Sequence, residues 1–150
     1  MLKIGDKFLF EENLLNRQTC LMFFKEYNSV SWSVDIGFKN GNFGDEILAP
    51  AICINPINTD KNSIEDLVGE IFRVATVEEC DDREDTFYLY ESEPMVSYEL
   101  EVLEIKDSRA HVRCNGILIV DGYSVPYIRE SFEIDAWIPV IESVNDWEKS

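Results

Sequence analysis

The chain has 150 residues, and 30 acidic against 13 basic side chains give it a formal net charge of −17. A field of this sign repels nucleic acid and anionic membrane surfaces, because binding to either depends on Lys and Arg meeting phosphate groups. Hydrophobic residues make up 45% of the chain and aromatic residues 12%, which is typical of a globular protein and not of a disordered acidic one. We therefore expect residues 1–150 to form a single domain that binds neither nucleic acid nor membranes.

The N-terminal half of the chain has mainly strand patterns. Thr19 to Glu26 is a compact apolar run, and Val30 to Ile36 alternates apolar with polar residues, as a half-buried strand does. Residues 39–44 contain an Asn-Gly turn signal and predict a loop. Ile47 to Ile54 predicts a third strand, in which Pro50 marks an edge or a bulge.

Helical patterns are short. Ser63 can cap a helix over residues 63–68, which Gly69 then ends. A second, weaker helical pattern covers Glu11–Asn16, and Glu70–Val77 returns to strand chemistry. The sequence therefore predicts one or two short helices.

The C-terminal half predicts a three-stranded meander. Apolar and polar residues alternate from Tyr98 to Val102, and at Leu103 the pattern slips by one residue, which predicts a β-bulge. Arg109–Val120 then pairs back, and Asp121-Gly122 predicts a two-residue hairpin turn into Tyr123–Ile134. The whole pattern predicts a mainly β (at most α+β) fold. We expect an antiparallel curved sheet, sandwich or half-open barrel of about 7–8 strands.

We expect no export or anchoring segment in this chain. The first residues lack the apolar run of a signal peptide, and no window approaches 18 apolar residues. Cys20, Cys53, Cys80 and Cys114 are widely separated, without the close pairs that zinc sites use, and three of them lie in apolar runs. We interpret them as small buried hydrophobes in a reducing compartment and expect a cytoplasmic protein with no metal or cofactor.

The sequence contains few of the residue patterns that are typical of catalytic sites. His111 is the only histidine, so a two-histidine metal site and most catalytic triads are excluded. Cys114 lies three residues from His111 on a predicted strand, which places the two side chains on opposite faces. No phosphate-binding loop or nucleophile elbow is present, and with 30 acids no carboxylate pair stands out. We therefore expect a binding protein and not an enzyme.

The segment Glu78–Glu93 holds eight acids and a single base, Arg83, with tyrosines interleaved. One interpretation is a solvated hairpin loop; the other is an electronegative surface that docks basic groups, since tyrosines and charged anchors are common interface hot spots. The residues that we expect to contact a partner are Glu78, Glu79, Asp81, Asp82, Glu84, Asp85, Tyr88, Tyr90, Glu91 and Glu93. A second, thinner acidic face is expected at Glu99, Glu101 and Glu104, together with Glu130 and Glu133 on a neighbouring strand.

Five stretches of this sequence occur in a combination that is found in a known class of proteins. They are Phe87-Tyr88-Leu89-Tyr90-Glu91-Ser92-Glu93-Pro94 after the acidic run, Tyr98-Glu99-Leu100-Glu101-Val102-Leu103, a hairpin with Gly116 and Asp121-Gly122-Tyr123, Phe132-Glu133-Ile134-Asp135-Ala136, and the Trp32-x-Val34-x-Ile36 strand. Together they resemble the small acidic immunity proteins of bacterial polymorphic-toxin and contact-dependent growth inhibition systems. The shared motifs are structural and identify no particular toxin type.

The resemblance implies a cognate protein toxin as the partner. Immunity proteins block a toxin, often a nuclease, by covering its active site or substrate groove, although some bind elsewhere. A nuclease needs a basic groove for phosphates, and an acidic inhibitor can associate with that groove rapidly at low salt.

Two other functions remain open at this point. One is a lipocalin-like, small-molecule-binding β-barrel, with a cavity of about 300 Å³ or more lined by Trp32, Trp137, Phe23, Phe24 and Phe132. The other is a small enzyme that uses carboxylates.

Overall fold

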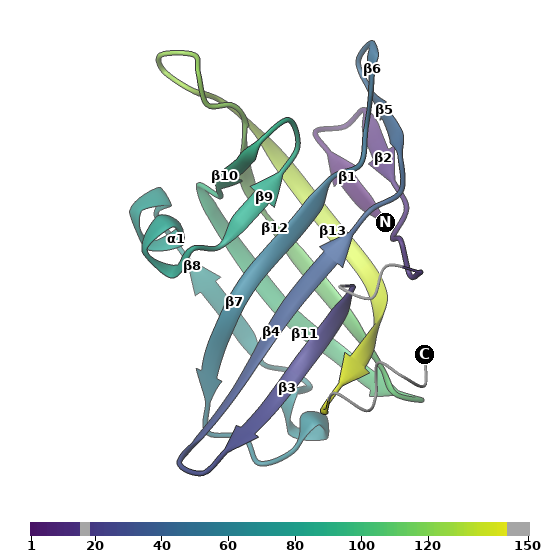
Figure 1. Ribbon diagram of the computed structural model, residues 1–150, viewed down its shortest axis with the longest axis vertical. Coiled ribbons are helices and arrows are strands. Elements are labelled where there is room, and N and C mark those ends of the chain that lie inside the picture. Colours follow the sequence, from purple (N-terminus) through teal and green to yellow (C-terminus); the bar gives the residue numbers. More distant parts are fainter. Residues whose placement is uncertain (16–18, 144–150) are drawn as a thin grey trace.

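The computed structural model describes residues 1–15 and 19–143, and Figure 1 shows that most of this chain is β-strand. Strands account for 61% of the described residues and helices for 8%. The strands are β1 (Leu2–Ile4), β2 (Phe8–Phe10), β3 (Cys20–Glu26), β4 (Ser29–Gly37), β5 (Gly41–Phe43), β6 (Glu46–Leu48), β7 (Ala51–Thr59), β8 (Ile71–Val74), β9 (Thr86–Tyr88), β10 (Ser92–Pro94), β11 (Ser97–Lys106), β12 (Arg109–Asp121) and β13 (Ile128–Ile141). The helices are the short 3-10 helix η1 (Ile64–Leu67) and the α-helix α1 (Val77–Arg83).

One large sheet contains most of these strands, in the order β10-β9-β7-β4-β3-β13-β12-β11-β8. In Figure 1, β3, β4 and β7 lie in front of and cross β11, β12 and β13, so the sheet bends until its two halves face each other. Among the described strands, β8 and β10 end the path without pairing to one another, so the sheet is not a closed barrel. The prediction of a mainly β protein is confirmed. The predicted count of 7–8 strands is wrong, because short edge strands and hairpins with weak sequence patterns add to it.

Strand β13 joins the two halves of the sheet. One side of its first part pairs with β1, where Leu2 is opposite Ile134, while its last residues pair with β3, where Val140 is opposite Leu21. The β13–β3 pairing is parallel, whereas the other strand pairs are antiparallel, so the sheet is mixed and not purely antiparallel. A small β1–β2 hairpin thus occupies one end of β13 and the β3–β4–β7 layer the other.

The core lies between the two facing halves. Phe87 from β9 and Phe132 from β13 bring their ring centroids to 5.4 Å, and Trp32 is fully buried beside them in the same cluster. The aromatic residues considered for a ligand cavity divide between two environments: Phe23, Trp32 and Phe132 are buried core residues, whereas Phe24 and Trp137 are half-buried. Side chains therefore fill the space that a lipocalin-like ligand would occupy.

The alternation in β11 follows the sequence pattern. Tyr98, Leu100 and Val102 point into the core, and the pairing with β12 shifts register between Val102 and Glu104. The bulge predicted at Leu103 is confirmed. A bulge inserts one extra residue into a strand, and this insertion shifts the apolar alternation by one position.

The predicted loop and strand over residues 39–54 are arranged differently. Gly41–Phe43 is a strand that pairs with Glu46–Leu48, and the chain turns at Gly44, whose φ of +63° suits glycine. The Asn-Gly signal therefore does not mark the turn. The predicted third strand is interrupted before Pro50, whose carbonyl accepts a hydrogen bond of 2.9 Å from the Phe38 amide.

Two helical predictions also change. Residues 64–67 form one turn of 3-10 helix, and the Ser63 side chain makes no capping hydrogen bond. Residues 11–15 are not helical, because Glu12 forms a β-bridge with Phe38; Asn16 lies outside the described residues. Contacts with residues distant in the sequence determine the structure of both segments. The hydrophobic periodicity within each segment does not reveal those contacts.

The turn after β12 is longer than two residues. The Asp121 carboxylate accepts hydrogen bonds of 2.9 Å from the Tyr123 amide and the Ser124 hydroxyl, and β13 begins only at Ile128. These local hydrogen bonds direct residues 122–127 away from the sheet, as the loop at the top of Figure 1 shows. In the described ranges no helix is long and apolar enough to cross a membrane.

Candidate partner-binding site

The acidic segment after β8 begins with a helix and not with a hairpin loop. The Thr76 hydroxyl accepts a hydrogen bond of 3.2 Å from the Glu79 amide, so Thr76 caps α1, and Glu78 and Glu79 lie in its first turn. Carboxylates there interact favourably with the positive end of the helix dipole. The helix ends at Glu84, which adopts a left-handed conformation with φ of 62°. Thr76-x-x-Glu79 has the capping-box spacing, so a sequence signal for this helix was present and was missed.

Five of the predicted contact residues lie together on this short element. Glu78, Glu79, Asp81 and Asp82 are exposed on α1, and Glu84 is exposed at its end. Cys80 is the fully buried residue of the helix and anchors it to the core. The segment therefore presents a row of carboxylates to solvent.

Asp85 is not part of this exposed row, because its side chain is completely buried. Its carboxylate accepts hydrogen bonds from the Tyr98 hydroxyl at 2.5 Å, the Arg83 Nε at 2.7 Å and the Asn55 amide at 2.8 Å. Burial and the hydrogen bond to Asp85 raise the pKa of Tyr98. Asp85 is thus a structural residue, and we remove it from the proposed contact surface.

The same cluster uses the only base of the acidic segment. Arg83 pairs with Asp85, donates to the Asn55 carbonyl at 2.9 Å, and places its guanidinium 4.7 Å from the centre of the Phe72 ring. Because Arg83 is engaged in this way, the exposed acids of Glu78–Glu93 have no basic partner within their own segment.

The two tyrosines of the segment lie on different surfaces. Tyr88 is on the outer face of the sheet, beside a hollow of about 440 Å³ that Asp35 and Cys53 also line. Burial raises the pKa of that Asp35 carboxyl, while its hydrogen bond with Cys53 opposes the rise. Tyr90 follows β9 in a turn at the end of the molecule, where its ring meets that of Phe43 edge-on at 6.0 Å. The structure therefore does not bring Tyr88 and Tyr90 together.

A pocket of about 440 Å³ lies beside Tyr90. It is lined by Tyr90, Glu91, Glu93, Val120, Asp121, Gly122, Tyr123 and Ile128, and we call it the aromatic–acidic pocket. The Tyr123 hydroxyl donates a hydrogen bond of 2.5 Å to Glu91, which raises the pKa of Tyr123. Hydrogen bonds from the Tyr123 amide and Ser124 lower the pKa of Asp121.

The loop that contributes Tyr123 to this pocket exposes further apolar surface. In the loop between β12 and β13, Tyr123 is 79% exposed and Val125 is 98% exposed, and Ile128 follows at 51%. Exposed aromatic and aliphatic groups next to carboxylates are the composition of an interface and are unusual on a surface that meets only water. Sequence reasoning did not identify Tyr123 or Val125, because an Asp-Gly signal suggested a tight turn there.

The acidic helix and the pocket are neighbours. Helix α1 contacts β10, and β10 carries Glu93 of the pocket. Figure 1 shows α1 beside β10, with the loop after β12 rising above them. These acids of the segment therefore form one surface, which we call the acidic side; its members are the exposed Glu78, Glu79, Asp81, Asp82, Glu84 and Glu91 and the half-buried Glu93.

The second predicted acidic face does not form. Strand β12 separates β11 from β13, so Glu130 and Glu133 are not on the strand next to Glu99. Arg73 pairs with Glu99 at 2.6 Å, and Arg113 lies opposite Glu101. Basic residues thus alternate with the acids across this face.

The single histidine also lies on that outer face. His111 stacks on Trp137 with ring centroids 4.9 Å apart, and its Nε2 lies 2.6 Å from an Asp135 carboxylate oxygen. Cys114 is buried on the other face of β12. Across the described ranges no group of three His, Cys, Asp or Glu side chains has the arrangement of a metal site.

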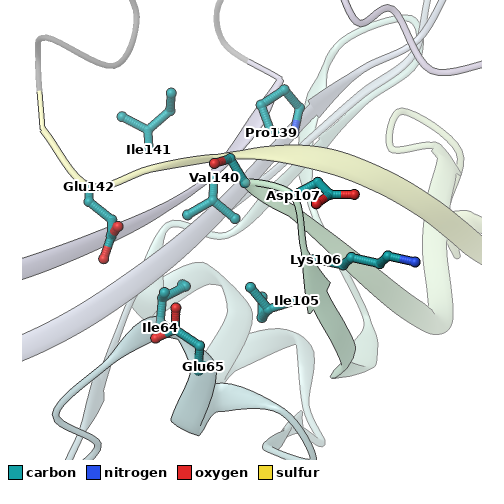
Figure 2. A pocket seen from close by; sticks show the side chains of 10 residues that line it. Ile64, Glu65, Ile105, Lys106, Asp107, Pro139, Val140, Ile141 and Glu142 are labelled. Carbon is teal, nitrogen blue, oxygen red and sulfur yellow. The ribbon is translucent and has the colours of Figure 1, made fainter.

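Figure 2 shows another pocket, of about 410 Å³, at the opposite end of the fold from the aromatic–acidic pocket. The turn after β11, the last residues of β13 and η1 form its walls, with Ile64, Ile105 and Val140 facing one another and Lys106, Asp107 and Glu142 around them. Its charged lining residues are Glu65, Asp107, Glu142 and Lys106, so it contains a base, which the lining of the aromatic–acidic pocket does not. Comparison with known proteins found no matching family model, curated protein or solved structure, so the function is argued from these surfaces.

Proposed function

We propose that this protein is an immunity protein that binds and neutralises a basic protein toxin, of which a nuclease is the expected kind. The observation that carries the proposal is the acidic side, where unpaired surface carboxylates on α1 adjoin a pocket with exposed tyrosines. This combination supplies both long-range attraction and an apolar anchor for a protein partner.

The charges favour a basic partner in particular. A net charge of −17 attracts a positive protein from a distance, and steering of this kind can raise association rates by about 10–10³-fold. A phosphate-binding groove is positive for its own catalytic reasons, so an acidic surface is complementary to it. Exposed tyrosines beside the carboxylates then provide rigid contact area once the two proteins meet.

The interior packing supports a protein ligand over a small one. Trp32, Phe87 and Phe132 fill the space between the facing halves of the sheet, and the three pockets described above lie at its surface. A lipocalin-like function would need that central space for its ligand.

The test uses the native host as a source of the partner. The full chain serves as bait, and the captured basic protein is expressed in cells with and without this chain. We expect the captured protein to arrest growth and co-expression of this chain to restore it. Capture of no basic protein, or a captured protein whose toxicity persists on co-expression, contradicts the proposal.

Charge reversal then locates the contact. The triple variant Asp81→Lys, Asp82→Lys and Glu84→Lys is expected to slow association about tenfold and to flatten its dependence on salt. The matched control is Glu26→Lys, Asp60→Lys and Glu65→Lys, which makes the same change in charge at exposed positions at the other end of the molecule. If both variants slow association equally, the contact does not involve the acidic side.

A further inference from the structure

We propose that the aromatic–acidic pocket receives an arginine side chain of the protein partner. The proposal deepens the function above and rests on it for the source of the arginine. It assigns the specific anchor of the interaction to Tyr90, Glu93 and Tyr123, and gives the acids of α1 the role of attraction at a distance.

The charge of the pocket requires a cation. Its lining contains the carboxylates of Glu91, Glu93 and Asp121 and no Lys, Arg or His. Neutral groups donate to two of them: the Tyr123 hydroxyl to Glu91, and the Tyr123 amide and Ser124 to Asp121. Within residues 1–15 and 19–143, no hydrogen bond or salt bridge occupies the carboxylate of Glu93. Three like charges around one hollow repel each other, and a bound cation removes that repulsion.

The shape and the apolar lining select arginine among cations. A guanidinium can stack on the faces of the Tyr90 and Tyr123 rings, while its planar fork donates two hydrogen bonds to one carboxylate. Val120 and Ile128 offer apolar surface for the alkyl stem of the same side chain. Lysine can use the charge but neither the fork nor the stacking, because its ammonium is a compact and strongly hydrated group.

Gly122 leaves the space that the Glu93 carboxylate occupies beside the pocket. A Cβ atom added at Gly122 would lie 2.7 Å from both carboxylate oxygens of Glu93, so any larger residue there must displace that carboxylate. The group displaced is the end of a flexible side chain, and Gly122 is exposed. Gly122→Ala is therefore a way to move the carboxylate while leaving the core intact.

The experiment is a two-dimensional NMR titration of the full chain with N-acetyl-arginine amide. The controls are N-acetyl-citrulline amide, which has the same shape without the charge, and N-acetyl-lysine amide. We expect the arginine probe to shift the amides of Glu93, Gly122 and Tyr123 saturably. The citrulline probe should shift none of them, and the lysine probe should bind about tenfold more weakly because it lacks the fork.

Matched variants separate the pocket from general charge. Glu91→Gln with Glu93→Gln, and separately Gly122→Ala, should weaken the arginine probe about tenfold. Asp81→Asn with Asp82→Asn on α1 removes the same two charges and should leave the affinity nearly unchanged. Equal weakening by the two double variants, shifts centred on α1, or no saturable shift would each overturn the proposal. The titration uses no toxin, so a negative titration does not contradict the proposed neutralisation of a toxin. Conversely, arginine binding can be measured even if no toxin is found.

Discussion

The hydroxyl of Tyr98 donates a 2.5 Å hydrogen bond to the fully buried carboxylate of Asp85. The two residues come from different elements, Tyr98 from β11 and Asp85 from the segment after α1, so this bond ties the acidic helix to the sheet. Arg83 and the Asn55 amide complete the environment of the carboxylate. A charged group can remain in the core only because these donors replace its water.

Removing the Tyr98 hydroxyl should therefore destabilise the fold. We expect Tyr98→Phe to lower the free energy of unfolding by about 1–3 kcal/mol, because it leaves a buried carboxylate without one of its donors. Urea denaturation measures the change. Tyr88→Phe is the matched control, since the Tyr88 hydroxyl is on an exposed side chain, and it should change stability by less than about 0.5 kcal/mol. Equal losses in the two variants would show that the Asp85 cluster does not stabilise the fold.

The cap of α1 is expected to contribute measurably to stability. Thr76→Ala removes the oxygen that accepts from the Glu79 amide and should lower the free energy of unfolding by about 0.5–2 kcal/mol. Thr76→Ser keeps an accepting oxygen and should lose much less. If the Glu79 amide exchanges faster in Thr76→Ala but not in Thr76→Ser, the loss of stability lies in the first turn of α1. Indistinguishable stabilities of the two variants would contradict a capping role.

The turn between β11 and β12 can be improved. Asp107 and Ser108 have φ angles of 54° and 61°, the left-handed conformation in which side chains other than those of Gly, Asn and Asp are strained. Asp107→Asn with Ser108→Gly gives the turn its preferred pair and should raise the free energy of unfolding by about 1 kcal/mol. Thermal and urea unfolding measure the gain. Ser108→Ala, which keeps a Cβ, should bring none, and a stabilised alanine variant would argue against this explanation.

Asp35 should make stability depend on pH in a direction opposite to that of most carboxylates. Burial raises its pKa above the ordinary value of 3.8, so the folded state holds this proton more tightly than the unfolded state. The contribution of protonated Asp35 to the free energy of unfolding is complete below about pH 3.8. It is lost as the pH rises through the raised pKa of the folded state. Asp35→Asn should therefore be more stable than the wild type at pH 7.

The comparison at low pH serves as the control for that variant. Below about pH 3 Asp35 is neutral in both states, so the advantage of Asp35→Asn should disappear there. Urea denaturation of both proteins at the two pH values gives the four free energies needed. A wild type that is more stable than the variant at pH 7 would reverse the sign and refute the interpretation.

Sequence patterns predicted the parts of the fold that depend on near neighbours. The slip at Leu103 revealed the bulge in β11, because alternation along one strand records which face each residue occupies. The alternation from Val30 to Ile36 likewise predicted β4. Such features are local, and a single segment contains the whole signal.

Features that depend on distant residues could not be predicted in this way. Asp85 looked like one more surface acid, since its partners Asn55 and Tyr98 are 30 and 13 positions away in the sequence. Asp121-Gly122 suggested a tight hairpin, but the Asp121 carboxylate accepts from both the Tyr123 amide and the Ser124 hydroxyl, and the loop is longer. The pocket depends on that longer loop, so the sequence predicted Tyr90, Glu91 and Glu93 as contact residues but neither Asp121 nor Tyr123.

The position of β13 has a consequence for how the protein is made. One edge of β13 pairs with β12, and the other edge receives two strands from the N-terminal part of the chain, with β1 opposite residues near 134 and β3 opposite residues near 141. During synthesis, the ribosome releases β1 and β3 long before it releases the strand on which both must pair. The edges of β1 and β3 that face β13 therefore stay without this partner until residues 128–141 have emerged, so the sheet can be completed only after that point of synthesis.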